Sequence, residues 1–258
     1  MSGVNSRTGD LSIRQRYPHP IASAWHRVSL ATNHAARVQQ AVQALDITLR
    51  VTAMLLVADY LRGPPVEPVE ELLARLDRPS LGVWLGLARE SLRALRDRDE
   101  EPFAPEAVPA WFTAKGKPTR ALKNADALVA LRNRIQHDGT AGGAAADAEN
   151  AEKLVHGMRE LLGSLEWLTA YRLARVVDQR PTRKRTTKGR VQFFDGATGL
   201  NEPVVAEWTA QLLPEAVYLV APRGEAVLEV SPMFAVAPTR TCRKTACSCC
   251  ATSTARAA

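Results

Sequence analysis

Aromatic residues and long apolar runs are scarce in this 258-residue chain, and each scarcity excludes a class of protein. Aromatics make up only 5% of the sequence, which disfavours an aromatic-rich surface for stacking nucleic-acid bases. The longest apolar run, Val51 to Ala58, is far shorter than the ~18–20 residues that span a bilayer. The N-terminal segment also has no apolar stretch of the secretory-signal type. We therefore expect neither secretion nor contact with a membrane.

Cysteine is confined to the end of the chain. All four cysteines lie in the last seventeen residues, at Cys242, Cys247, Cys249 and Cys250. A core without cysteine is not cross-linked by disulfides, so the sequence predicts a reducing, cytoplasmic location. Four thiolates suffice for a zinc ion, but the spacing lacks the paired C-x2-C knuckles typical of structural zinc sites. We expect no metal and no other cofactor.

The common nucleotide-binding and hydrolase motifs are missing as well. The chain has no Walker A, G-x-G-x-x-G, H-E-x-x-H or G-x-S-x-G sequence. This excludes P-loop NTPases, dinucleotide-dependent dehydrogenases, zincin proteases and α/β-hydrolases. Hydrophobic residues are nevertheless 46% of the chain, which is enough for a folded core.

The basic residues are unevenly distributed. The formal net charge is +7, yet the segment from Arg172 to Arg190 alone carries +7, and the segment from Thr239 to the C-terminus carries +4. The rest of the chain therefore carries −4. Because binding to a nucleic-acid backbone requires positive charge, the expected basic surface lies outside the main body of the chain.

Apolar residues recur at three-to-four-residue spacing through the first 178 residues, which predicts helices. Expected helices cover residues 21–30, 33–62, 70–76, 81–96, 119–137 and 147–177. Thr32 or Asn33 is expected to cap the long second helix, and Ser80 the fourth. On the long helix, Asp46 interrupts the apolar stripe, and two interpretations are open: it pairs with Arg50 at i+4, or it points inward and orients the site. The short connections favour an up-and-down helical bundle.

Short β-prone runs separated by turn residues follow the helices. Expected strands cover residues 190–194, 204–208, 217–221 and 226–230. So few residues bury little core, and the expected fold class is mainly α, a helical bundle with a small C-terminal β appendage. The expected divisions are a flexible N-terminal arm (1–16), the helical bundle (17–178), a basic linker (179–190), a small β module (191–238) and a disordered tail (239–258).

One segment, Arg132-Asn133-Arg134-Ile135-Gln136-His137, carries side chains suited to chemistry. On a helix, Asn133 and His137 lie on one face a turn apart, and the long side chain of Arg132 can reach the imidazole. Histidine exchanges protons near neutral pH, and arginine can brace a phosphorane through two parallel hydrogen bonds. These groups could cleave RNA without a metal ion. Alternatively, Arg and His in a last turn before Gly139 simply suit the negative end of the helix dipole.

Arg132-Asn133-x-x-x-His137 resembles the R-N-x-x-x-H motif of the HEPN superfamily. The sequences at residues 19–22 and 79–85 are similar to HEPN-like N-terminal regions of bacterial multidomain proteins, and the resemblance covers residues 17–178. It implies a four-to-five-helix bundle that often dimerises, so that motif helices from two copies form one metal-independent RNase site. It also implies that His137 is the acid/base, that Arg132 stabilises the phosphate and that Asn133 fixes the site.

The resemblance therefore predicts an endoribonuclease of a bacterial defence or toxin system. The alternative, also found in the family, is a non-catalytic dimerisation or sensing module that binds a partner protein or nucleotide. Expected partners are RNA, a second copy of the chain, and a cognate antitoxin or defence protein. Basic residues expected to contact RNA phosphates are Arg134, Arg183, Lys184, Arg185 and Lys188.

Overall fold

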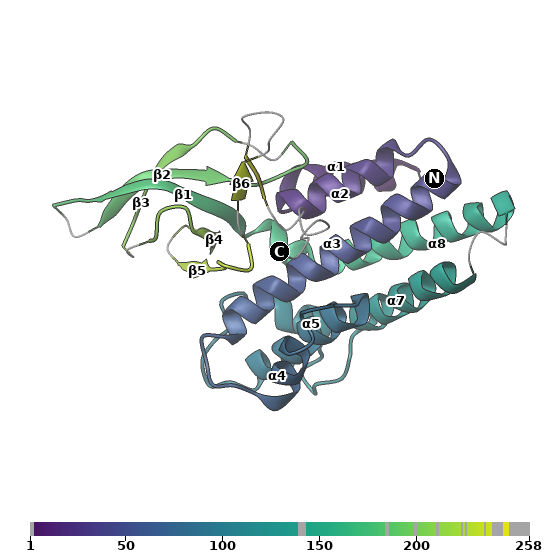
Figure 1. Ribbon diagram of the computed structural model, residues 1–258, viewed down its shortest axis with the longest axis horizontal. Helices are drawn as coiled ribbons and strands as arrows, with labels where there is room; N and C mark the ends of the chain where they lie inside the picture. The colour runs from purple at the N-terminus through teal and green to yellow at the C-terminus, as the bar shows by residue number, and fades with distance from the viewer. Residues whose placement is uncertain are drawn as a thin grey trace. The chain divides into compact units, whose positions relative to one another are not determined.

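The chain folds into two compact units. The computed structural model describes residues 3–138, 143–183, 186–198, 201–209, 212–222, 224, 226–234, 236–238 and 245–247. One unit, here the helical unit, comprises Ala24–Trp167, and the other, here the sheet unit, combines Met1–Ser23 with Leu168–Ala258. Each unit is drawn with its secondary structure in Figure 1.

Helix α3 lies at the centre of the helical unit and packs against α5 and α8 (Figure 1). The helices are α2 (His19–Leu30, beginning in the sheet unit), α3 (His34–Tyr60), α4 (Glu67–Leu73), α5 (Leu81–Arg96), α6 (Ala107–Trp111), α7 (Arg120–Asp138) and α8 (Gly143–Ser164). A 3-10 turn, Glu166–Thr169, follows. As expected from the sequence, the side chains of Asn33 and Ser80 cap α3 and α5, accepting from Ala36 N at 2.8 Å and Val83 N at 3.3 Å.

Helix α3 is buried along most of its length. Fifteen of its 27 residues are buried, and beyond Leu49 they occupy nearly every side of the helix. By length and composition alone α3 could cross a membrane, but 67% of its most apolar 18-residue window is buried within the protein. A helix that is apolar on all sides and enclosed by α5 and α8 has the character of a core helix.

The sheet unit contains a five-stranded antiparallel sheet with strand order β3-β2-β1-β4-β5. Its strands are β1 (Arg172–Pro181), β2 (Thr187–Phe193), β3 (Val204–Trp208), β4 (Val217–Val220) and β5 (Val227–Glu229). A separate pair comprises β6 (Val236–Pro238) and β7 (Thr245–Cys247). One face of the large sheet buries Val176, Val191, Trp208, Leu212 and Tyr218 in a single cluster. This cluster gives the sheet a hydrophobic core of its own.

Helix α1 (Gly3–Arg16) belongs to the sheet unit although it is far from the strands in sequence. Its C-terminal end contacts the turn after β2, where Ala197 N donates to Arg14 O at 2.7 Å and Gly196 N donates to Tyr17 O at 2.9 Å. His19 Nδ1 donates to Gly196 O at 2.8 Å. Gly196 has a φ of +68°, and a Cβ there would lie 3.1 Å from Gln15 O, so only glycine fits without strain. Backbone contacts thus attach the N-terminal segment to the sheet.

The expected fold class is wrong. The described residues form eight α-helices together with a five-stranded antiparallel sheet, which is a mixed α/β architecture rather than a helical bundle with a small appendage. The last long helix ends at Ser164 instead of continuing to Val177, because residues from Arg172 onward pair with β2 and β4. The helix expected over 147–177 thus includes residues that the structure places in β1.

Four expected divisions of the chain also differ from the structure. The arm at 1–16 contains helix α1, and the described residues of the basic linker at 179–190 include the end of β1 and the start of β2. The β module expected to begin at 191 begins instead at Arg172. Within the expected disordered tail, Thr245–Cys247 forms β7 against β6, and the other residues of 239–258 lie outside the described part of the chain.

Candidate functional site

Helix α7 carries the three residues of the predicted site. Its inward side is apolar and buried, with Leu122, Ala125 and Leu128 at 3% exposure or less, and it packs against α5 and α8. Asn133 and His137 are exposed and Arg132 is half-buried, so the side chains of the predicted site lie largely outside this packed side of α7.

A close approach between α7 and α8 fixes the position of the motif helix. Asn124 Nδ2 donates to the carbonyl oxygen of Gly157 at 2.8 Å. A Cβ on Gly157 would lie 2.7 Å from Leu128 Cδ2, so the absence of a side chain allows the two helices to touch. A partly buried hydrogen bond and tight packing therefore hold the backbone that presents the site.

The side chains of the site are organised by one hydrogen bond. Arg132 donates from Nη1 to Asn133 Oδ1 at 3.0 Å, on the exposed side of α7. His137 is one turn further along the helix, and within the described residues nothing hydrogen-bonds its imidazole. The structure thus places the guanidinium of Arg132 against Asn133, while Asn133 and His137 are exposed one helical turn apart.

The residues expected to bind RNA do not all belong to the same unit as this site. Arg134 is exposed on α7, next to the site residues. Arg183 lies in the turn after β1 and Lys188 is exposed on β2, so both belong to the sheet unit. Lys184 and Arg185 lie outside the described residues. Of these five residues, only Arg134 is brought to the site by the fold of the helical unit.

Ion pairs offset part of the positive charge between residues 172 and 190. Arg190 forms an ion pair with Asp178, in which Arg190 Nη2 lies 2.5 Å from Asp178 Oδ2. The hydrogen bond from Arg190 lowers the pKa of the Asp178 carboxyl group below its usual value. Arg172 binds Asp195 at 2.6 Å and its guanidinium lies 3.5 Å from the centre of the Phe193 ring. These arginines therefore stabilise the sheet unit locally, and their charge is only partly available to a ligand.

The cysteines give no metal site that the structure can describe. Cys242, Cys249 and Cys250 lie outside the described residues, and Cys247 is known only as part of strand β7. A search of the described residues finds no cluster of three or more His, Cys, Asp or Glu side chains suited to a metal ion.

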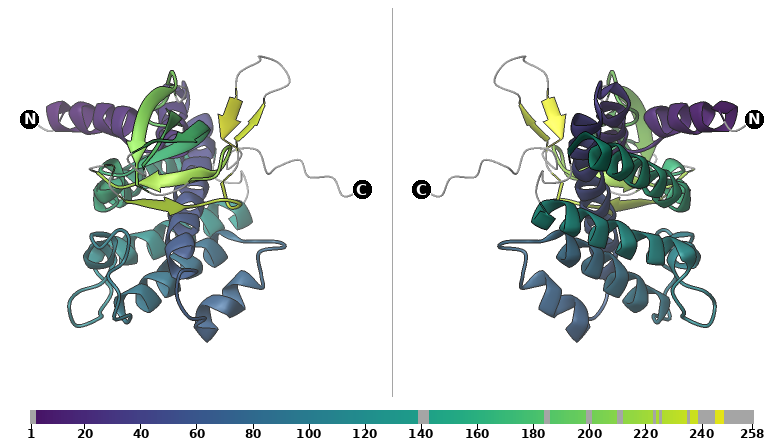
Figure 2. Two further views of the ribbon diagram at one scale, coloured as in Figure 1. Left: turned by 90° about the vertical axis from the view of Figure 1, so that its left-hand side faces the viewer. Right: turned by 90° about the vertical axis from the view of Figure 1, so that its right-hand side faces the viewer.

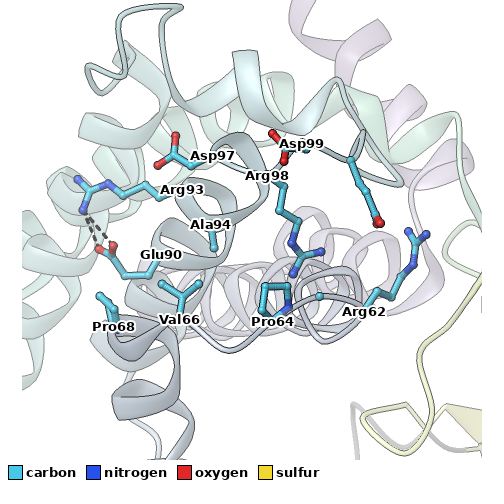
Figure 3. Close-up of a pocket in the computed structure, with 12 residues that line it drawn as sticks. Arg62, Pro64, Val66, Pro68, Glu90, Arg93, Ala94, Asp97, Arg98 and Asp99 are labelled. Carbon is cyan, nitrogen blue, oxygen red and sulfur yellow. Dashed lines mark hydrogen bonds and ion pairs between the residues drawn. The ribbon is translucent and has the colours of Figure 1, made fainter.

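A first pocket in the helical unit, of about 830 Å³, lies beside the C-terminal ends of α3 and α5 (Figure 3). Its lining includes three arginines and four carboxylates, namely Arg62, Arg93, Arg98, Glu90, Asp97, Asp99 and Glu100. The dashed lines in Figure 3 show Arg93 bonded to both carboxylate oxygens of Glu90, each at 3.0 Å. Arg98 donates to the carbonyl oxygens of Asp59 and Tyr60 at the end of α3. Two of the arginines that line this pocket are therefore already engaged, Arg93 by the carboxylate of Glu90 and Arg98 by the end of α3.

A second pocket, of about 1020 Å³, lies between the start of α3 and α8. Its charged and titratable lining residues are His34, Arg37, Glu149, Glu152, Lys153, His156 and Arg159. The five of these residues that belong to α8 recur at three-to-four-residue spacing. From the sequence, this spacing predicts that they share one polar face of the helix. That this face meets the start of α3 follows only from the tertiary structure.

Comparisons with protein-family models, with curated proteins and with solved structures found no match to this chain. A functional interpretation therefore depends on the geometry of α7 and on the HEPN-like spacing of its residues.

Proposed function

We propose that this chain is a metal-independent endoribonuclease of HEPN type whose site is formed by Arg132, Asn133 and His137. The observation that supports this is the hydrogen bond from Arg132 to the Asn133 side chain, with an accessible His137 one turn away. Had these residues served only to cap the helix, their side chains would bond the last carbonyl groups of α7. Within the described residues, neither Arg132 nor His137 does so, which favours a role toward a ligand.

The proposed reaction is an internal transfer of the phosphate. The neutral imidazole of His137 accepts the proton of a ribose 2′-OH, and the 2′-oxygen attacks the adjacent phosphorus. Arg132, held by Asn133, donates hydrogen bonds to the equatorial oxygens as their negative charge develops. The bond from phosphorus to the 5′-oxygen breaks and that oxygen accepts a proton. The products are a 2′,3′-cyclic phosphate and a 5′-hydroxyl end.

The geometry of the reaction favours a site built by two copies of the chain. The attacking and leaving oxygens lie roughly in line on opposite sides of the phosphorus, so one imidazole cannot approach both at once. Each copy presents a single His137 on an exposed helix face. A homodimer that brings two α7 faces together would supply one histidine as base and the other as acid.

The biological setting is proposed on the resemblance alone. HEPN-type nucleases act in toxin–antitoxin and antiviral defence systems, so we place this chain in the bacterial cytoplasm with a cognate antitoxin or defence protein as its regulator. An accessible α7 face also suits the alternative function, a non-catalytic dimerisation or sensing module. The two functions differ in whether RNA is cleaved.

The decisive experiment is RNA cleavage by the purified chain in the presence of EDTA. We expect fragments with cyclic phosphate ends, and a rate reduction of about 10²–10⁴-fold in His137→Ala and in Arg132→Ala. Arg75→Ala and His26→Ala, which change the same residue types away from the site, should cleave normally. Unchanged cleavage in both site variants would overturn the assignment. A stable dimer that cleaves no RNA would support the non-catalytic alternative.

A further inference from the structure

We propose that the pocket between the start of α3 and α8 is a groove that binds the phosphate backbone of the RNA next to the cleavage site. We call it the basic groove and define it by Arg37, Lys153 and Arg159, together with His34 and His156. The identity of the ligand as RNA rests on the proposed function. The groove itself rests on the observations that follow.

The first observation is charge. The helical unit carries 18 Lys and Arg against 19 Asp and Glu, so its net charge of −1 gives it no general attraction for a polyanion. The first pocket has three arginines against four carboxylates. The basic groove reverses this balance, with three basic residues against Glu149 and Glu152. Local positive charge is what backbone binding requires.

The second observation is that the arginines of the groove are held in place. The guanidinium of Arg159 lies 5.7 Å from the centre of the Trp25 ring, and Trp25 is 2% exposed and so immobile. Arg37 donates from Nη2 to Ala31 O at 3.3 Å. Both side chains remain partly exposed. Because they are already ordered, binding a phosphate costs less conformational entropy than it would with free side chains.

The third observation concerns the acids of the groove. Lys153 Nζ lies 2.5 Å from Glu149 Oε1, an exposed i,i+4 pair. Exposed pairs of this kind contribute only about 0–1 kcal/mol, so a phosphate can compete for Lys153. Glu152 is exposed on the same helix face. It would repel a phosphate, which provides a substitution expected to strengthen binding.

The fourth observation is position. Figure 1 shows the C-terminal end of α7, the N-terminal end of α8 and the N-terminal end of α3 at the same end of the helical unit, and Figure 2 (right) shows this end from the front. The site residues are on the last turns of α7, and the groove is formed by the first turns of α3 and by α8. The groove and the site residues thus lie at the same end of one unit.

The test measures binding separately from cleavage. Fluorescence anisotropy with a labelled single-stranded RNA of about 20 nucleotides is recorded on the full-length His137→Ala chain, in which cleavage is expected to be about 10²–10⁴-fold slower, over a range of salt concentrations. Adding Arg37→Gln and Lys153→Gln should weaken binding about tenfold and reduce the slope of log K against log salt by about 1.4, since each single-strand contact contributes about 0.7. Adding Glu152→Gln instead should strengthen binding. The control pair Lys115→Gln and Lys117→Gln removes the same charge from exposed positions outside the groove and should leave both quantities unchanged.

The outcomes separate the groove from the proposed catalytic site. The proposal is overturned if the groove variants and the control pair weaken RNA binding equally. It is also overturned if Glu152→Gln leaves RNA binding unchanged. In either case the groove is better interpreted as a site of contact with a protein. If the unaltered chain cleaves nothing but the groove variants still lose RNA binding, the groove is upheld and the proposed nuclease function fails.

Discussion

A buried carboxylate at the end of α3 is expected to contribute strongly to the stability of the helical unit. The side chain of Asp59 is only 6% exposed. Its Oδ2 accepts a hydrogen bond from Phe103 N at 2.7 Å, and its Oδ1 accepts one from Arg62 Nη1 at 2.9 Å. The bond to Phe103 joins α3 to a segment 44 residues later in the chain, beyond α5. Asp59→Ala would leave the Phe103 amide without its acceptor.

The expected loss of stability follows from these contacts. A hydrogen bond to a charged group contributes about 1.5–3 kcal/mol, and a buried donor left without an acceptor costs about 1–3 kcal/mol. The contribution of Arg62 is small because its side chain is 48% exposed. Alanine favours the helix by up to ~0.7 kcal/mol over aspartate. We therefore expect Asp59→Ala to lower the free energy of unfolding by about 2 kcal/mol, and Asp59→Asn, which keeps an acceptor, by about half as much.

Urea denaturation provides the measurement, and Asp46→Ala on the same helix is the matched control. Asp46 also pairs with an arginine, Arg50, at 2.8 Å, but its side chain is 37% exposed and the pair is of the i,i+4 type. Such pairs contribute ~0.3–0.5 kcal/mol, so the gain in helix propensity should bring the net change close to zero. If Asp59→Ala and Asp46→Ala lower the free energy of unfolding equally, the hydrogen bond between Asp59 and Phe103 does not make the expected contribution to stability.

Two further predictions concern Tyr60 and Gly189. Tyr60 donates to Glu70 Oε1 at 2.7 Å and accepts from Val66 N at 2.6 Å, so Tyr60→Phe should cost about 1–2 kcal/mol in urea denaturation. Burial, followed by the hydrogen bond to Glu70, raises the pKa of Tyr60, so the native state retains this proton longer than the unfolded chain. Stability should fall as pH rises above about 10, and Tyr60→Phe should lose this part of the dependence. Gly189→Ala would place a Cβ 2.1 Å from Asp178 O, so the variant should unfold at a lower temperature than the unaltered chain. An unchanged midpoint of thermal unfolding would contradict the pairing of Gly189 with Gln179 between β1 and β2.

Features that depend on neighbouring residues could be predicted from the sequence. The caps at Asn33 and Ser80, the boundaries of β3 and the pairing of Asp46 with Arg50 are all confirmed. Each depends on residues within about one helical turn or one strand. The alternation of apolar side chains and the chemistry of caps and turns therefore suffice to predict them.

Features that depend on distant partners could not be predicted in this way. Residues 172–177 have spacing that a helix could accommodate, but Leu173 pairs with Leu219 and Ala174 with Phe193, and these pairings make the segment a strand. Helix α1 has little apolar surface of its own, and its C-terminal end contacts the turn after β2, where Ala197 N donates to Arg14 O. Tertiary contacts override weak local preferences in both segments.

Helical spacing in the sequence is enough to place Asn133 and His137 one turn apart on α7. The sequence also shows that the positive charge lies mostly outside the helical body. The exposure of Asn133 and His137 depends instead on the folded chain, since burial of Leu122, Ala125 and Leu128 against neighbouring helices sets the rotation of α7. The tertiary structure alone brought Arg37 to Lys153 and Arg159. Such residues, over a hundred positions apart, meet only when the apolar surfaces between them are buried.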